Sequence, residues 1–178
     1  PIRKAQPQGQ RVLSVKIGIV SDTHDHLSLI GKAVEAFNAS GVGLVLHAGD
    51  FVSPFTAPRF KPLKARMTGV FGNNDGDRTL LRRRFSEINV EIKDTIAVLE
   101  AEAVRMAATH GHDEDLLKAL IDSGSFGVVA YGHTHQAVVE RRGKTLVINP
   151  GEACGYLSGD ATIAILDTAR LEAEIIRL

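Results

Sequence analysis

The chain has 178 residues, 44% of them hydrophobic, and its 21 basic and 21 acidic side chains give a formal net charge of zero. This length suits one domain with one core, and the balanced charge argues against a nucleic-acid or anionic-membrane surface. The single cysteine, Cys154, excludes an intrachain disulfide and fits a reducing cytoplasm. No apolar run reaches the roughly 20 residues that a membrane span needs. We therefore expect a cytoplasmic protein without membrane or nucleic-acid partners.

The first part of the chain alternates strands with helices. Residues 1–11 are polar and rich in Gln, Pro and Gly, which predicts a flexible tail before a single domain over 12–178. Apolar β-rich runs predict strands at 12–20, 43–50 and 65–72. Helical spacing predicts helices at 27–37, 53–63 and 79–84. This β-α-β order favours a parallel sheet.

The later part of the chain is richer in hairpins. A strand pair turns near Ala101 and Glu102, and a helix follows from about Asp113, its expected N-cap, to Ile121. One strand is predicted at 127–135, and hairpins are predicted at 137–151 and 161–178. These segments should add antiparallel strands. The simplest fold is α/β, with two mixed β-sheets packed as a sandwich and helices outside.

Polar side chains that can bind metals follow five of the apolar runs. They occur in "SDTHD", "AGD", "GNND", "THGH" and "GHTH", and the candidate ligands are Asp22, His24, Asp50, Asn73, His110, His133 and His135. Strand ends along one sheet edge can bring such groups together. In Asp-x-His and His-x-His, alternate side chains would point the same way on an extended backbone. Imidazole, carboxylate and carboxamide donors without thiolate suit Mn, Fe, Co, Ni or Zn, and one bridging carboxylate would allow two ions.

Taken singly, each of these residues also has a structural explanation. Asp22 or Asp50 could cap a helix or shape a turn, and Asn73 could belong to an Asn-rich turn. We expect His47 to be a packed core residue rather than a ligand. The basic run 82–84 is expected to be a solvated helix face rather than a phosphate-binding patch. All five segments together, in this order, favour a metal centre.

These five blocks resemble the pattern of the calcineurin-type metallophosphoesterases over residues 16–178. The compact size and the run "INPGEACGY" resemble more narrowly the small phosphodiesterases of archaea and bacteria, a subfamily that shares its fold with the eukaryotic retromer scaffold subunit. The resemblance implies the metallophosphoesterase-like sandwich and a dinuclear centre. It also implies hydrolysis of a small phosphodiester by metal-activated hydroxide, and a homodimer, which is common in the subfamily.

The resemblance also implies a division of the ligands. Asp50 would bridge two divalent ions, with Mn favoured and Ni, Fe, Co or Zn as alternatives. The two sets of remaining ligands would be Asp22, His24 and His135 for the first metal, and Asn73, His110 and His133 for the second.

One position departs from the family pattern. Many members carry a histidine after the ligand asparagine, where it is thought to protonate the leaving group, but this chain has Asn74. An amide cannot act as an acid near neutral pH, although it can still donate a hydrogen bond to a phosphate oxygen. The loss of general-acid help typically costs a factor of about 10² to 10⁴. His26 and His112 are candidate proton donors, and each could equally be a solvent residue or a neighbour of the ligands.

Three other functions compete with hydrolysis. A scaffold or ligand-binding module could use the same fold, but all seven ligand positions carry competent residues. An amidohydrolase barrel also uses a His-x-His pair, but it needs about 250 residues. Passive metal binding or nucleotide sensing would bind a ligand tightly without turnover. The sequence names no physiological substrate.

Overall fold

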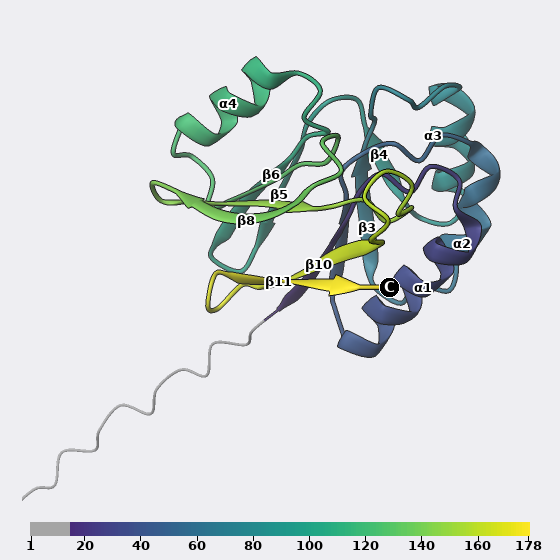
Figure 1. The fold of residues 1–178 in the computed structure, drawn as a ribbon, viewed down its shortest axis with the longest axis horizontal. Helices are drawn as coiled ribbons and strands as arrows, with labels where there is room; N and C mark the ends of the chain where they lie inside the picture. Colours follow the sequence, from purple (N-terminus) through teal and green to yellow (C-terminus); the bar gives the residue numbers. More distant parts are fainter. Residues whose placement is uncertain (1–14) are drawn as a thin grey trace, which may run out of the picture.

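The computed structural model describes residues 15–178, so the tail predicted at 1–11 and the start of the first predicted strand lie outside the described residues. Two mixed β-sheets pack face to face, with α1, α2 and α3 outside one sheet and α4 outside the other (Figure 1). The predicted α/β sandwich is therefore confirmed. No helix in the described range is long and apolar enough to cross a bilayer.

The six-stranded sheet has the order β11-β10-β1-β2-β3-β4. Its parallel strands are β1 (Lys16–Val20), β2 (Leu44–His47), β3 (Arg66–Val70) and β4 (Glu91–Lys93). The short β4 was not predicted from the sequence. The antiparallel hairpin of β10 (Thr162–Asp167) and β11 (Glu172–Arg177) completes the sheet on the other side of β1.

The five-stranded sheet has the order β5-β6-β7-β9-β8. Its strands are β5 (Ala97–Ala101), β6 (Val104–Ala108), β7 (Val128–Ala130), β8 (Ala137–Arg142) and β9 (Thr145–Pro150). The predicted hairpins β5–β6 and β8–β9 are present. The expectation of added antiparallel strands was incomplete, because β6, β7 and β9 run parallel. The helix between β6 and β7 reverses the chain and allows this parallel pairing.

The helices are α1 (Leu27–Ser40), α2 (Ala57–Phe60), α3 (Arg78–Ser86) and α4 (Glu114–Asp122), with a 3₁₀ turn at Pro54–Thr56. Asp113 caps α4, as predicted, by accepting the backbone N–H of Leu116. Arg82, Arg83 and Arg84 of α3 are exposed, and they pair with Asp94 or Glu87. The prediction of a solvated basic face is therefore confirmed.

Alternation along the strands divides the core into layers. Ile17 and Ile19 of β1 point into the space between the sheets, where they pack with residues such as Met106 and Ile148. On the opposite face of the six-stranded sheet, neighbouring strand residues pack under α1, α2 and α3. The outer face of the five-stranded sheet packs against Ile121 of α4. Both faces of each sheet are thus covered, which leaves the strand ends as the place for polar groups.

Candidate metal centre

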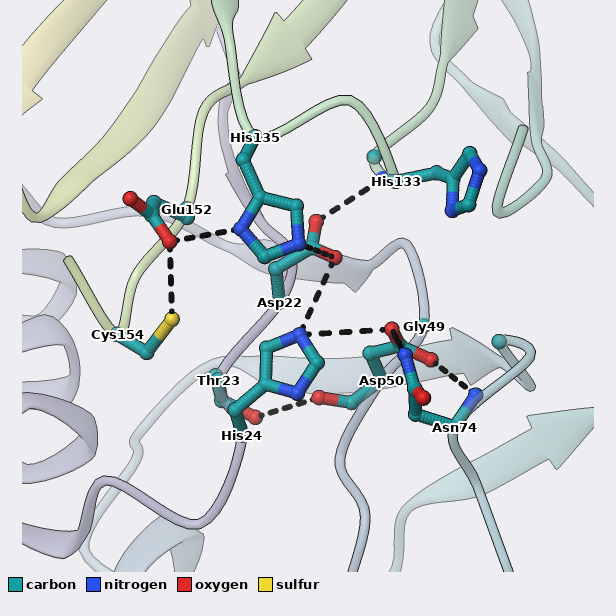
Figure 2. Close-up of polar contacts among 12 residues, drawn as sticks. Asp22, Thr23, His24, Gly49, Asp50, Asn74, His133, His135, Glu152 and Cys154 are labelled. Carbon is teal, nitrogen blue, oxygen red and sulfur yellow. Dashed lines mark hydrogen bonds and ion pairs between the residues drawn. The ribbon is translucent and has the colours of Figure 1, made fainter. Parts of the chain in front are cut away.

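The predicted ligands follow the carboxyl ends of parallel strands. Asp22 and His24 follow β1, Asp50 follows β2, Asn73 follows β3, His110 follows β6, and His133 and His135 follow β7. Parallel strands end at the same edge of a sheet, so each sheet gathers its polar loops on one side. Figure 2 shows side chains from both sheets pointing toward one another at this edge.

Hydrogen bonds join the loops of the two sheets. The backbone N–H of Cys154, which follows β9, donates to the Asp22 carbonyl at 3.1 Å. Within the six-stranded sheet, the Asp22 N–H donates to the Gly49 carbonyl at 3.0 Å and joins the loops after β1 and β2. The imidazole Nδ1 of His110 lies 2.7 Å from the carbonyl oxygen of Ala48. These contacts fix the two sheet edges relative to each other.

The ligand pairs do not have the extended backbone that we expected. Asp22 and His24 have φ angles of 53° and 37°, and His133 and His135 have φ angles of 66° and 59°. Asp50, with φ 60°, is also left-handed. The prediction of extended pairs was therefore wrong, because sharp left-handed turns, and not strand alternation, aim these side chains. Such turns cost non-glycine residues free energy and are concentrated at functional sites.

Asp50 lies at the middle of the cluster. Its Oδ2 is 3.5 Å from Nε2 of His24 and 3.4 Å from Nε2 of His110. The backbone and side-chain N–H groups of Asn74 donate to the same carboxylate at 2.9 Å and 2.7 Å. The Asp50 side chain is almost wholly buried. One carboxylate therefore faces two imidazoles that come from different sheets.

The first predicted ligand set is close together. Nε2 of His135 lies 3.3 Å from Oδ1 of Asp22, and Nε2 of His24 lies 3.7 Å from the same atom. Asp22, His24 and Asp50 offer donor atoms that all lie within 4.8 Å of one another. Asp22 Oδ1 and His24 Nε2 are buried and have no hydrogen-bond partner. Buried polar atoms are rarely left unpaired, so this donor set fits a divalent cation.

The second predicted set is looser. Nε2 of His110 lies 2.9 Å from Oδ1 of Asn73. His133 is exposed, its ring centroid lies 5.2 Å from that of His110, and its backbone N–H donates to Asp22. Figure 2 shows the His133 ring at the outer side of the cluster. Because the Ala48 carbonyl can only accept, Nδ1 of His110 carries the proton and Nε2 is left available for a cation.

The three candidate catalytic residues lie around this cluster. Asn74 is exposed, and its side-chain amide donates to Asp50. His26 is the N-cap of α1, where its Nδ1 accepts the backbone N–H of Leu29. His112 is exposed, and its ring centroid lies 5.4 Å from that of His110. His26 thus has a structural role whether or not it also acts in catalysis.

Electrostatics favour positive charge in the cluster. The Asp22 carboxylate raises the pKa of His24. Burial lowers the pKa of His110, but the neighbouring Asp50 carboxylate outweighs burial, so the net shift is upward. Burial raises the pKa of Asp50, but contacts with His110 and Asn74 outweigh burial, so the net shift is downward. The carboxylates remain charged and attract protons or cations, as a metal centre requires.

Sequence reasoning missed two buried carboxylates. Asp75 accepts the backbone N–H groups of Gly72, Asp50 and Val52, and so holds the loop that carries Asp50. Glu152 accepts Nδ1 of His135 at 2.7 Å. Hydrogen bonds from Ser158 and His135 outweigh the opposing effect of burial and lower the pKa of Glu152 to about 2. The sequence marks these two residues only by their place shortly after a strand, since Asp75 follows β3 and Glu152 follows β9.

Cys154 lies beside the first ligand set. Its thiol forms a close group with His24 and His135, and it donates to Glu152 at 3.2 Å. Burial raises the pKa of this thiol to about 12. The thiol thus serves as a hydrogen-bond donor to the Glu152 carboxylate beside the predicted ligands.

Two glycines allow the loops to approach closely. A Cβ atom at Gly72 would lie 2.1 Å from Oδ1 of Asp50. A Cβ atom at Gly132 would lie 2.6 Å from Oδ2 of Asp22. Any side chain at either position would displace a predicted ligand.

His47 is a core residue, as predicted. It is fully buried and its ring stacks on Phe51 at 3.6 Å. Its Nδ1 accepts the Gly49 N–H, and its Nε2 lies 3.2 Å from Oγ1 of Thr23. Burial lowers the pKa of His47 to about 3. The neutral ring therefore supports the Asp50 loop without being a ligand.

Two phosphodiesterases are similar to this chain in sequence. A phosphodiesterase from Methanocaldococcus jannaschii is 49% identical over 159 residues, which cover 89% of this chain and 96% of that protein. The phosphodiesterase YfcE from Escherichia coli K12 is 27% identical over 169 residues, covering 86% and 88%.

Solved structures show the same fold. A structure of an archaeal phosphodiesterase has a TM-score of 0.88 at 48% identity, and the match covers 92% of this chain and 100% of that one. A Vps29 structure from Entamoeba histolytica has a TM-score of 0.66 at 18% identity, covering 92% and 98%, and it shows the fold alone.

The family model for the calcineurin-like phosphoesterase superfamily domain matches residues 15–171. This match contains all seven predicted ligands and both missed carboxylates. The chain therefore belongs to the calcineurin-like phosphoesterase superfamily, whose members depend on metal ions.

Proposed function

We propose that this chain is a phosphodiesterase that hydrolyses small phosphodiesters with the help of two divalent cations, Mn²⁺ being favoured. Its phosphodiesterase relative, 49% identical over 89% of the chain, supports the reaction class. The observation that carries the proposal is the pair of unpartnered buried atoms, Asp22 Oδ1 and His24 Nε2, beside the Asp50 carboxylate. A cation would satisfy all three groups at once.

In this proposal the ligands keep the roles given by the resemblance, with Asp22, His24 and His135 on the first cation, Asn73, His110 and His133 on the second, and Asp50 between them. When bound, two such cations would lower the pKa of water toward neutrality and neutralise charge on the phosphate. The chain's own residues hold the donors in place. The Ala48 carbonyl orients His110, Glu152 orients His135, and Asn74 orients Asp50.

Asn74 cannot supply a proton to the leaving group. His26 accepts a backbone N–H at Nδ1, so its neutral ring carries a proton at Nε2 that it could donate. His112 is exposed beside His110. Both remain proposed proton donors. An enzyme that lacks a proton donor should hydrolyse esters with poor leaving groups much more slowly than esters with good leaving groups, so comparing the two kinds of ester tests for a donor.

A non-catalytic scaffold is the second candidate function. The Vps29 neighbours have this fold, and fold alone does not determine function. Complete retention of metal-competent side chains at the seven ligand positions favours hydrolysis.

A hydrolysis panel tests the proposal directly. Bis(4-nitrophenyl) phosphate and 4-nitrophenyl phosphate would be compared across Mn²⁺, Ni²⁺, Co²⁺ and Zn²⁺, before and after chelation. We expect diester hydrolysis that chelation abolishes and Mn²⁺ restores. Full activity in the chelated protein, or a preference for the monoester, would contradict the proposal. Metal binding without any hydrolysis would favour the scaffold.

A further inference from the structure

Glu152 is completely buried, and its two oxygens collect an unusual number of donors. The donors are His135 Nδ1, Cys154 Sγ, the backbone N–H groups of Tyr156, Leu157 and Ser158, and the Ser158 hydroxyl. Residues 154–158, which we call the rim loop, thus wrap around one carboxylate. Successive backbone N–H groups make a favourable site for an anion.

Side-chain packing contributes little to the rim loop beyond Cys154. Tyr156 is 61% exposed and Leu157 is 77% exposed, so burial of these large side chains does not stabilise its conformation. The hydrogen bonds from Leu157 and Ser158 to Glu152 replace that missing packing. Removing the carboxylate would leave the backbone N–H groups of Leu157 and Ser158 without their shared acceptor, so the rim loop would lose the contacts that order it.

The same carboxylate orients a predicted ligand. Glu152 accepts Nδ1–H of His135 at 2.7 Å, which directs the other ring nitrogen, Nε2, at Oδ1 of Asp22, 3.3 Å away (Figure 2). Histidines that bind metals commonly use such a partner on the other ring nitrogen, and its loss typically lowers metal affinity by 10- to 100-fold.

The rim loop also borders the candidate site. The ring of Tyr156 lies 5.4 Å from the ring of His26, which is two residues after the predicted ligand His24. Ser158 of the rim loop and the predicted ligand His135 together line a pocket of about 540 Å³. A substrate held beside His135 would therefore have one of its ester groups next to this loop.

We propose that Glu152 is a positioning residue that couples the orientation of His135 to the conformation of the rim loop. One buried carboxylate then determines both the metal affinity of the site and the conformation of the loop that lies beside the ester group. This inference rests on the proposed function.

Two variants separate the two tasks. Glu152→Gln keeps the shape of the side chain but removes its charge, so we expect Mn²⁺ affinity to fall about 10- to 100-fold. We also expect KM for bis(4-nitrophenyl) phosphate at saturating Mn²⁺ to rise, and chymotrypsin to cleave faster after Tyr156. Ser158→Ala removes only a loop contact, so KM and cleavage should rise while Mn²⁺ affinity stays within about twofold of wild type. Glu100→Gln, which changes an exposed glutamate of β5, is the matched control and should change none of these.

The measurements are calorimetric titration of Mn²⁺, steady-state kinetics and limited proteolysis, with melting temperature as the check on folding. Wild-type Mn²⁺ affinity in folded Glu152→Gln protein would overturn the inference, because Glu152 would then be only a structural residue of the loop. If that variant does not fold, nitrogen-15 spectra of the histidine-labelled, Zn²⁺-loaded wild type show which ring nitrogen of His135 carries the proton. A proton on Nδ1 of His135 is expected, and a proton on Nε2 would overturn the inference. Failure of the wild type to bind cations or hydrolyse the diester would instead defeat the proposed function.

Discussion

Nε2 of His110 lies 3.4 Å from Oδ2 of Asp50, although Asp50 follows a strand of one sheet and His110 a strand of the other. The contact requires the carboxyl edges of both sheets to meet. Because Asp50 also lies 3.5 Å from His24, its carboxylate is shared between the two halves of the cluster. A change at this residue should therefore affect both halves together.

Asp50→Asn should be the most damaging single substitution. The amide lacks the charge that would hold two cations, so we expect metal content to fall and kcat/KM for a diester to drop more than about 100-fold, the upper end of what losing a ligand's partner costs. Metal analysis and steady-state kinetics on the same sample provide the check. Asp94→Asn, at an exposed carboxylate paired with Arg82, should behave as wild type. Wild-type metal content and rate in Asp50→Asn would show that the carboxylate does not bridge.

Gly72→Ala should disrupt the centre through sterics alone. The new methyl group would lie 2.1 Å from Oδ1 of Asp50, so either Asp50 or the loop must move. We expect the free energy of unfolding to fall by about 1 to 3 kcal/mol and diester hydrolysis to be largely lost. Gly76→Ala is the matched control, because nothing lies within 4 Å of its added Cβ. Urea unfolding of the two variants should differ clearly, and equal stability and activity would contradict the close approach.

Asn74→His should change the dependence on the leaving group. An imidazole can supply the proton that the amide cannot. We therefore expect kcat/KM to rise by up to about 100-fold for methyl phenyl phosphate, which has a poor leaving group. Nitrophenyl phosphodiesters, whose leaving group needs no proton, should gain little. In Asn74→Ala the backbone bond to Asp50 at 2.9 Å remains, and both esters should slow by a similar factor. Parallel kinetics on the two esters give the answer. An equal change for both esters in Asn74→His would mean that proton donation does not limit the reaction.

His47 should make the protein sensitive to acid. Its pKa is about 3 in the folded protein, whereas an unfolded histidine titrates near 6.5, so the unfolded state binds one more proton between these values. Stability is then full above pH 6.5 and is lost as pH falls, by about 1.4 kcal/mol for each pH unit from this residue. Urea unfolding between pH 4 and about 8 should show a slope lower by about one proton in His47→Gln than in wild type.

The exposed His112→Gln variant is the comparison for His47, and it should keep the wild-type slope. Identical slopes for all three proteins would show that the buried ring of His47 is not held neutral.

Most strands and helices, and the places of the candidate ligands at strand ends, could be predicted from the sequence, because apolar runs that end in Asp, Asn or His mark strand ends directly. The short β4 could not, and neither could the shape of the turns. Left-handed φ angles at Asp22 and His133 depend on loops from both sheets, and local sequence does not reveal such tertiary constraints. Glu152 and Asp75 were missed for a related reason, since each acts by accepting backbone N–H groups, and those have no sequence signature.

The pairing of β1 with β10 has a consequence for how the chain is made. Lys16 pairs with Asp167, so one neighbour of β1 in the sheet lies near the other end of the chain. During synthesis from the N-terminus, β1, β2 and β3 can assemble early, but the edge of β1 stays open until β10 has left the ribosome. Long-range pairing of this kind slows folding and exposes strand edges. A nascent chain stopped before β10 should therefore depend on chaperones far more than the finished protein.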